Sequence, residues 1–116
     1  MTNRISLYVD QIEILTRCGA AFNLTGHLRS NHVTDASVCA ALPNQTRCRV
    51  TDANEEGRKC LIPQVELAPD GETRFSLSIE VECKLSGDTY HTTLDVVAHS
   101  DSGCTDKRTV ALEVRC

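Results

Sequence analysis

Cysteine is the residue type with the clearest chemical potential in this sequence. The 116-residue chain contains seven cysteines, which is a high density for a chain of this length. They are Cys18, Cys39, Cys48, Cys60, Cys83, Cys104 and Cys116. Such a density in a small chain has two common causes, disulfide bonds formed in an oxidising compartment and a structural metal ion.

The cysteine spacing favours disulfides over a metal site. Structural zinc sites usually contain close pairs such as C-x2-C, whereas the closest pair here, Cys39 and Cys48, is nine positions apart. No C-x-x-C redox motif is present. Among the histidines, only His27 and His32 lie within five positions of each other. We therefore expect about three disulfides, no metal ion and no cofactor.

The odd number of cysteines leaves at least one without a partner inside the chain. The sequence does not determine the pairing. A bridge between Cys48 and Cys60 is one option, and would stabilise the fold by about 3 kcal/mol in the chain-entropy model. We expect the unpaired residue among Cys18, Cys83 and Cys116, which continue the apolar faces of three strands. Cys116 is the first candidate, because a partner in another chain would give a disulfide-linked dimer.

Two N-glycosylation motifs point to the same compartment. They are Asn23-Leu24-Thr25 and Asn44-Gln45-Thr46. We expect glycans at Asn23 and Asn44, on a protein that is secreted or displayed at the cell surface. The N-terminus lacks a basic segment followed by an apolar run, so we expect that a signal peptide has been removed.

No other group of residues forms a catalytic pattern. Gly-rich phosphate loops, G-x-S-x-G elbows and H-E-x-x-H helices are missing from the sequence. Asp101 and Asp106 flank a loop that could hold calcium, but their spacing is sparser than D-x-D-x-D-G. Glu80, Glu82 and Glu113 fall on outward strand faces and are interpreted as solubilising charge. We expect that the protein is not an enzyme.

Charge and composition restrict the partners. Twelve basic and sixteen acidic residues give a net charge of −4, which provides no electrostatic reason to bind nucleic acid. No apolar run approaches the roughly 18 residues that span a bilayer, so we expect no membrane insertion of this segment. Four aromatic residues and no tryptophan argue against a stacking platform for sugars or single strands. The length predicts one domain, 1–116.

The second half of the chain predicts strands. Apolar and polar residues alternate there with a period of two, as in strands with one buried and one wet face. The alternating runs are 61–68, 75–85, 90–98 and 109–116. Pro69-Asp70-Gly71 and Ser86-Gly87-Asp88 carry turn residues between them. The pattern predicts a four-strand antiparallel meander, with a polar loop at 99–107 that contains Cys104.

The first half is less regular. Residues 5–18 alternate, with a phase slip at Asp10-Gln11 that indicates a bulge or bend in a strand, and 19–28 is a weaker strand. Residues 30–60 show no sustained period and are expected to form a long loop held by three cysteines. Within that loop, 35–42 fits a short helix with Asp35 as its N-cap.

Together these patterns predict an all-β, antiparallel β-sandwich. The chain lacks the tryptophan and the D-x-G-x-Y-x-C run of immunoglobulin domains, and no family resemblance emerges. We expect a non-catalytic extracellular recognition or adhesion module of a larger secreted or cell-surface protein. Its partner would be another protein, which is a receptor, a ligand or a second copy. The loop 30–60 is the expected binding surface, although the sequence does not specify individual binding residues.

Three alternatives remain open. The first is a freestanding secreted inhibitor or effector that binds a protease, a cytokine or a host factor. The second is a structural subunit that self-assembles through edge strands or a free cysteine. The third is a small secreted enzyme or metal-dependent module.

Overall fold

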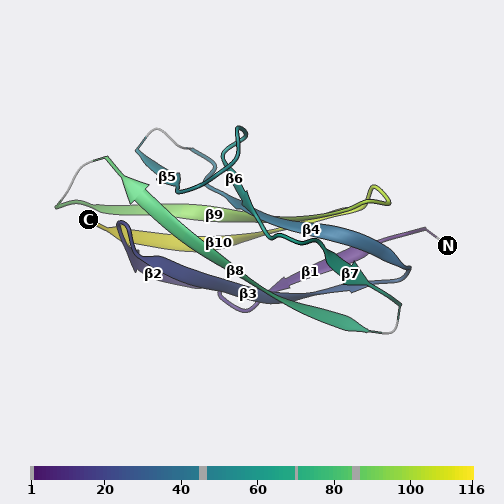
Figure 1. Ribbon diagram of the computed structural model, residues 1–116. Helices are drawn as coiled ribbons and strands as arrows, with labels where there is room; N and C mark the ends of the chain where they lie inside the picture. Colours follow the sequence, from purple (N-terminus) through teal and green to yellow (C-terminus); the bar gives the residue numbers. More distant parts are fainter. Residues whose placement is uncertain (1, 45–46, 70, 85–86) are drawn as a thin grey trace.

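The protein folds into two β-sheets that face each other (Figure 1). The computed structural model describes residues 2–44, 47–69, 71–84 and 87–116. These residues form strands and no helix, so none of them belongs to a helix able to cross a membrane. The predicted all-β sandwich is confirmed. The molecule is elongated, at 51 × 26 × 21 Å, and the N- and C-termini of the chain lie at opposite ends of the sandwich.

The described residues form ten strands. They are β1 (Ile5–Val9), β2 (Glu13–Arg17), β3 (Ala21–Ser30), β4 (Thr34–Ala41), β5 (Cys48–Val50), β6 (Arg58–Cys60), β7 (Val65–Leu67), β8 (Glu72–Cys83), β9 (Thr89–Ser100) and β10 (Thr105–Arg115). One sheet has the order β1-β3-β8-β5. The other has the order β2-β10-β9-β4-β6, and β7 pairs with β4 beside β6.

The phase slip at Asp10-Gln11 marks a crossing from one sheet to the other. β1 pairs antiparallel with β3, whereas β2 pairs in parallel with β10. Ile5 and Leu7 therefore enter the core from the first sheet and Ile14 enters it from the second. The slip changes which residues point inward because the chain changes sheets, which a bulge within one strand would not require.

The strand order is that of an immunoglobulin-type sandwich, in which four strands ABED face a sheet that contains GFC. β1, β3, β8 and β5 take the places of A, B, E and D, and β10, β9 and β4 take those of G, F and C. The inter-sheet disulfide of antibody domains has no counterpart, because β3 and β9 contain no cysteine. The two sheets are therefore joined by apolar packing.

The core is almost entirely aliphatic. The largest fully buried apolar side chains are Leu7, Leu24, Leu28, Ile79, Leu94, Val38, Val81, Val96, Val110 and Val114. Burial of each such side chain stabilises the fold by roughly 1.5–3 kcal/mol. Phe75 is the aromatic residue of the buried set.

Gly26 fills a tight position in this core. It lies on β3 between the inward-facing Leu24 and Leu28. A Cβ atom at this position would collide with the Tyr8 carbonyl oxygen and would lie 2.9 Å from Cζ of Phe75. The approach of β1 and of the Phe75 ring therefore requires glycine.

Three expectations about individual elements were wrong. Residues 35–42 form strand β4 instead of a helix, because Ala36, Val38 and Ala40 face the core at a period of two. β4 also has hydrogen-bonded neighbours on both sides, β9 on one and β6 with β7 on the other. β4, β5 and β6 all lie within the expected loop 30–60. The polar loop after β9 is shorter than 99–107, since β9 ends at Ser100 and β10 begins at Thr105.

The predicted meander was also wrong. β9 and β10 pair along their whole length, but β7 pairs with β4 and β8 pairs with β3. The chain passes from one sheet to the other between β7 and β8 and again between β8 and β9. Asp70 and Ser86, at the centres of the two predicted turns, lie outside the described residues.

Candidate protein-binding site

Six of the seven cysteines form three disulfides, as the spacing predicted. Each bridge joins two neighbouring strands of one sheet or the residues directly after them. The pairs are Cys18–Cys116, Cys39–Cys60 and Cys48–Cys83. The disulfides therefore cross-link neighbouring strands within each sheet and do not link one sheet to the other.

The unpaired cysteine is Cys104, so the expectation that it lies among the strand-end cysteines was wrong. The parallel pairing of β2 with β10 places the Cα atoms of Cys18 and Cys116 5.0 Å apart. Sequence gave no sign of that parallel pair, because β1 and β2 look like one strand. Cys104 is half-buried in the turn between β9 and β10.

The suggested bridge between Cys48 and Cys60 is also not formed. In the strand registers, Cys39 lies directly opposite Cys60 and Cys48 lies directly opposite Cys83. The Cα atoms in each of these pairs are 4.0 Å apart. Register, which depends on tertiary pairing, therefore selects the partners.

Two of the bridges contact each other at one end of the sandwich. The Sγ atoms of Cys18, Cys83 and Cys116 lie within 4.8 Å of one another, and all three residues are half-buried. Metal ions bind thiolates, whereas these sulfur atoms belong to cystines. In the oxidised protein these cysteines therefore serve as structural disulfides.

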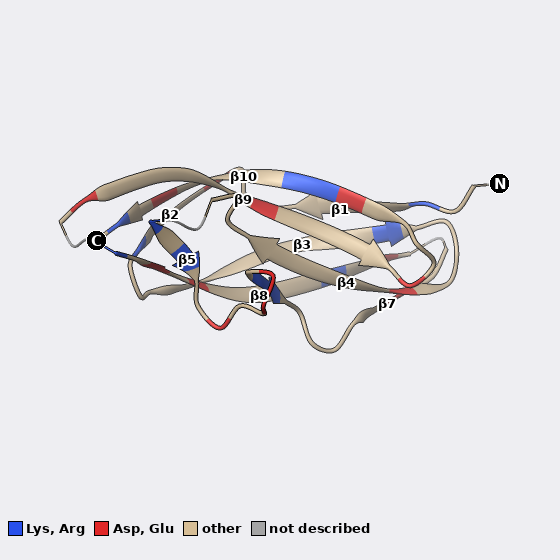
Figure 2. Ribbon diagram, turned by 90° about the horizontal axis from the view of Figure 1, so that it is seen from above, with Lys and Arg blue, Asp and Glu red and all other residues tan. Residues whose placement is uncertain are grey.

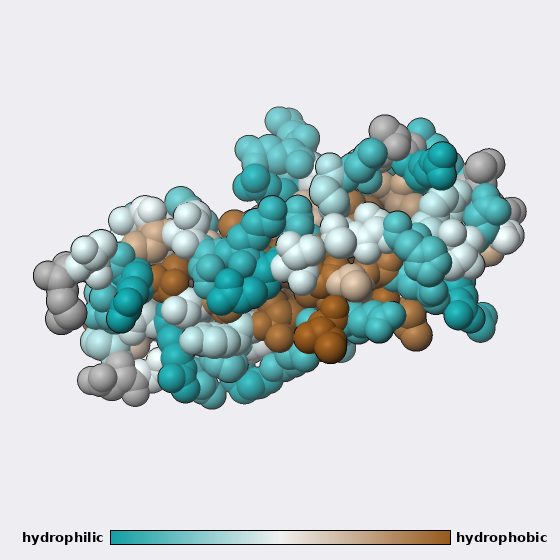
Figure 3. Space-filling view, turned by 180° about the vertical axis from the view of Figure 1, so that it is seen from behind, coloured by the Kyte–Doolittle hydropathy of each residue, from teal (hydrophilic) through white to brown (hydrophobic). Residues whose placement is uncertain are grey.

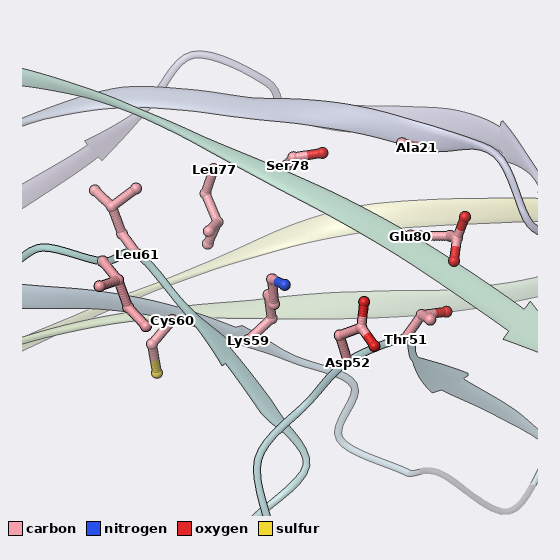
Figure 4. Close-up of a pocket in the computed structure, with 10 residues that line it drawn as sticks. Ala21, Thr51, Asp52, Lys59, Cys60, Leu61, Leu77, Ser78 and Glu80 are labelled. Atoms are coloured by element: carbon pink, nitrogen blue, oxygen red, sulfur yellow. The ribbon is translucent and has the colours of Figure 1, made fainter.

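A groove opens between β8 and the segment that contains β6, with a volume of about 450 Å³. Leu77, Ser78 and Glu80 of β8 form one wall (Figure 4). Lys59 and Leu61 face them from the other wall. The groove thus lies between one edge of the four-stranded sheet and one edge of the larger sheet.

The groove has an apolar end and a charged end. Leu61 and Leu77 lie toward one end, and Asp52 and Glu80 lie toward the other (Figure 4). Among the described residues, none of the ion pairs involves Asp52, Lys59 or Glu80. These charges therefore remain available to a ligand.

Three further features characterise the groove. Cys39–Cys60 and Cys48–Cys83 hold both ends of the intervening chain to β4 and β8. The Thr51 hydroxyl oxygen, on the groove wall, is buried and has no hydrogen-bond partner in the described part of the chain. Ile62, at the rim, is 88% exposed. The disulfides thus hold the walls in place, while the Thr51 hydroxyl has no hydrogen-bond partner among the described residues and the Ile62 side chain is exposed to solvent.

The outer face of the four-stranded sheet carries a second group of chemically active side chains. Tyr8 stacks on His27 with a centroid distance of 4.6 Å. His27 and Arg29 approach the Glu72 carboxylate at 3.6 and 3.1 Å. The Arg29 hydrogen bond, followed by the charge of His27, lowers the pKa of Glu72 below its ordinary value.

A neighbouring ion pair on this face is built around Asp10. The Thr25 hydroxyl donates a 2.8 Å hydrogen bond to its carboxylate, and Arg74 lies 2.7 Å from the same oxygen. The Thr25 hydrogen bond, followed by the Arg74 charge, lowers the pKa of Asp10. Because these charges are paired with each other, the face offers little free charge to a partner.

Charge elsewhere is dispersed. In the described residues, basic and acidic positions interleave along the strands and loops (Figure 2). Glu82 pairs with Arg49 at 3.2 Å, and Glu113 pairs with Arg115 at 3.1 Å. On the rear face, hydrophobic side chains gather along the middle between hydrophilic ones (Figure 3).

The remaining predicted residues lie apart from the groove walls or take other contacts. Asn23 is exposed on the outer face of β3, where a glycan has access. Asn44 is exposed, but Gln45 and Thr46 of its motif lie outside the described residues. The Asp101 carboxylate accepts a hydrogen bond from Gln64, and that of Asp106 accepts one from the Leu7 amide.

Sequence reasoning missed one arrangement that resembles catalytic geometry. The Ser102 hydroxyl lies 2.6 Å from Nε2 of His32, whose Nδ1 lies 2.9 Å from the Asn31 amide oxygen. A serine nucleophile also needs backbone donors for an oxyanion. The amides of the next two residues, Gly103 and Cys104, both donate to Ser100 instead. We interpret the arrangement as a tether between two loops.

Comparison with known proteins bears on the fold. No protein-family model matches the chain, and no curated protein matches it. A solved structure that matches is "Pseudomonas fluorescens alkylpurine DNA glycosylase AlkC bound to DNA containing an abasic site analog", with a TM-score of 0.51 and 12% identity. The match covers 98% of this chain and 30% of that chain. A likeness at this identity shows that the two share a fold over that region.

Proposed function

We propose that the protein is a non-catalytic extracellular recognition module that binds another protein through the groove between β8 and residues 51–62. The observation that carries this proposal is a groove of about 450 Å³ whose walls are held by two disulfides. A binding surface that is ordered before its partner arrives loses less conformational entropy on association.

The chemistry of the groove suits a protein ligand. Apolar side chains at Leu61 and Ile62 combine with charges at Asp52 and Glu80 that no ion pair among the described residues involves. Protein interfaces usually join an apolar centre to a polar rim. No nucleophile and base with an oxyanion site accompany the groove walls among the described residues, so we propose binding without chemistry.

An extracellular location is the setting that accounts for the covalent structure. Three disulfides form readily in the secretory pathway and are rare in reducing compartments. The Asn23 motif is exposed on β3. We propose that the chain forms part of a larger secreted or cell-surface protein. A freestanding inhibitor would use the same groove.

DNA binding is not proposed, although the structural neighbour binds DNA. The net charge is −4, and the groove has two carboxylates against one lysine. A DNA-binding surface gains most of its affinity from cations that neutralise phosphates.

The experiment screens the glycosylated protein against an array of purified extracellular domains. Each hit is then measured with Ile62→Arg and with Val33→Arg as a matched control. Both side chains are exposed, at 88% and 79%, but only Ile62 lines the groove. We expect Ile62→Arg to weaken binding at least tenfold and Val33→Arg to change it less than twofold. Hits that tolerate both changes would refute the groove as the binding site.

A further inference from the structure

We propose that the partner enters the groove as an extended peptide segment that adds a strand to the open edge of β8. This inference rests on the proposed protein-binding role of the groove. It specifies how the partner is recognised, because backbone hydrogen bonds would supply affinity and alternating side chains would supply specificity.

β8 has a strand partner on only one side along most of its length. On one side, β3 pairs with residues 72–80. On the other side, β5 pairs only with residues 81–83, and the Thr51 amide donates to the Glu80 carbonyl at 2.8 Å. Among the described residues, no strand pairs with this side of β8 before Glu80.

The backbone groups on the open side can be assigned. The Glu80 carbonyl points toward the open side, since it accepts from Thr51, whereas the Val81 carbonyl accepts from Gly19 on the β3 side. In an antiparallel strand the direction alternates from residue to residue. The N–H and C=O groups of Ser76 and Ser78 therefore point to the open side, and Ser78 lines the groove.

The middle of this edge, between the charged residues Arg74 and Glu80, lacks several of the devices that usually prevent strand addition. Natural edges are protected by short length, proline, bulges or charged side chains. The β3 register runs without interruption from Glu72 to Glu80, so the stretch contains no bulge. Residues 75–79 contain neither proline nor a charged residue. By contrast, the edge of β1 is covered where the Leu7 amide donates to Asp106 at 2.8 Å.

The walls define which peptide would fit. Its inward side chains would meet Leu61 and Leu77, so they should be aliphatic. Its outward side chains would lie beside Ser78 and Glu80 on the outer face of the sheet. Two carboxylates at the charged end, Asp52 and Glu80, favour a lysine or arginine there. The expected occupant is therefore an extended segment that alternates aliphatic and polar residues and ends on a basic residue.

A random dodecapeptide phage library provides the probe. Peptides selected on the glycosylated protein are synthesised, and their dissociation constants are measured by fluorescence polarisation. Ser78→Pro removes the N–H group that points to the open side of β8, and proline is tolerated on edge strands. The control Ser78→Ala keeps this N–H group. We expect Ser78→Pro to weaken binding at least tenfold and Ser78→Ala less than twofold.

Peptide N-methylation provides a test that does not depend on the folding of a variant. Methyl groups placed on successive peptide amides should weaken binding at every second position, because only alternate N–H groups face β8. Uniform effects along the peptide, or none, would overturn strand addition.

The two proposals fail in different ways. Peptides that are sensitive to Ile62→Arg but indifferent to Ser78→Pro and to N-methylation would leave the groove as the site and refute strand addition. A selection without any peptide that depends on Ile62 or Ser78 would refute strand addition, whereas array hits that tolerate Ile62→Arg would refute the groove itself. A dimer in light scattering that Ser78→Pro dissociates would identify a second copy as the occupant and overturn the partner peptide.

Discussion

Removing the disulfides one at a time should destabilise the fold in an order set by chain separation. The separations are 98 residues for Cys18–Cys116, 35 for Cys48–Cys83 and 21 for Cys39–Cys60. In the chain-entropy model the corresponding losses are about 4.7, 3.8 and 3.3 kcal/mol. The longest bridge should therefore exceed the shortest by at most about 1.4 kcal/mol, because Cys48–Cys83 shortens the loop that Cys18–Cys116 closes.

The choice of replacement matters for this comparison. Cys48 is only 6% exposed, so serine at this position would bury a hydroxyl at a cost of about 1–3 kcal/mol. That cost would obscure the differences between bridges. Both cysteines of each pair should therefore become alanine, in a background where Cys104→Ala prevents thiol exchange.

The assay is urea unfolding at equilibrium, followed by circular dichroism. Each double variant is compared with the Cys104→Ala parent, and the m-value is fitted freely to detect changes in the denatured state. Equal losses for the three bridges, or the largest loss for Cys39–Cys60, would show that closure of the unfolded chain does not govern the stabilisation.

The same variants separate stability from binding. Loss of Cys39–Cys60 releases one groove wall, so peptide affinity should fall even though this variant loses the least stability. Loss of Cys18–Cys116 should leave peptide affinity within twofold of the parent while the protein remains folded. A variant without Cys39–Cys60 that keeps the peptide affinity of the parent, with a loss of affinity in the variant without Cys18–Cys116, would contradict the role assigned to the groove.

Three further perturbations test other parts of the structure. Gly26→Ala places a Cβ against backbone and Phe75, so it should destabilise by about 3 kcal/mol or more in urea unfolding. Thr25→Val removes the largest cause of the lowered Asp10 pKa, so this pKa should rise in an NMR titration of the carboxyl. The denatured, unreduced protein should react with one equivalent of a thiol reagent, and Cys104→Ala should abolish the reaction.

Each perturbation has a control or a contradicting result. Gly71→Ala should be nearly neutral, because its Cβ would meet nothing closer than 4.0 Å. Asn23→Gln removes the same glycosylation motif as Thr25→Val and should leave the Asp10 pKa unchanged. More than one reactive thiol would contradict the three bridges.

The lowered pKa values also predict the direction of acid sensitivity. Asp10 and Glu72 have folded-state pKa values below their ordinary values of 3.8 and 4.5. Their contribution to stability is therefore complete above those ordinary values and is lost as the pH falls through the folded-state pKa. Arg74→Ala should reduce the part of this acid dependence that comes from Asp10.

Strand positions were predictable where one face of a strand is buried and the other is wet. Residues 75–83 of the predicted run 75–85 lie in β8, Leu85 lies outside the described residues, and 90–98 lies within β9. The same alternation cannot say which strand lies alongside, because a buried face looks alike in either sheet. β7 and β8 were therefore placed in one meander, although they belong to different sheets.

The limits at the site have the same origin. Residues 51–52 and 59–62 lie in and just after the segment that was expected to bind, and they form one wall of the groove. The other wall consists of Leu77, Ser78 and Glu80, which have the pattern of an ordinary strand. An open edge is a property of missing neighbours, and no residue type in β8 reports it.

The bridge between Cys18 and Cys116 has a mechanical consequence. A force applied between residues 2 and 116 would pass from the end of β2 across this bridge, bypassing the 98-residue loop that it closes. Only β1 and β2 could be peeled away, which limits the extension to about 60 Å, whereas the reduced chain could extend to about 400 Å. Under tension the oxidised protein should extend only a short distance while the part of the sandwich between Cys18 and Cys116 stays folded. Single-molecule pulling with and without reductant would measure the extension of the oxidised and of the reduced chain.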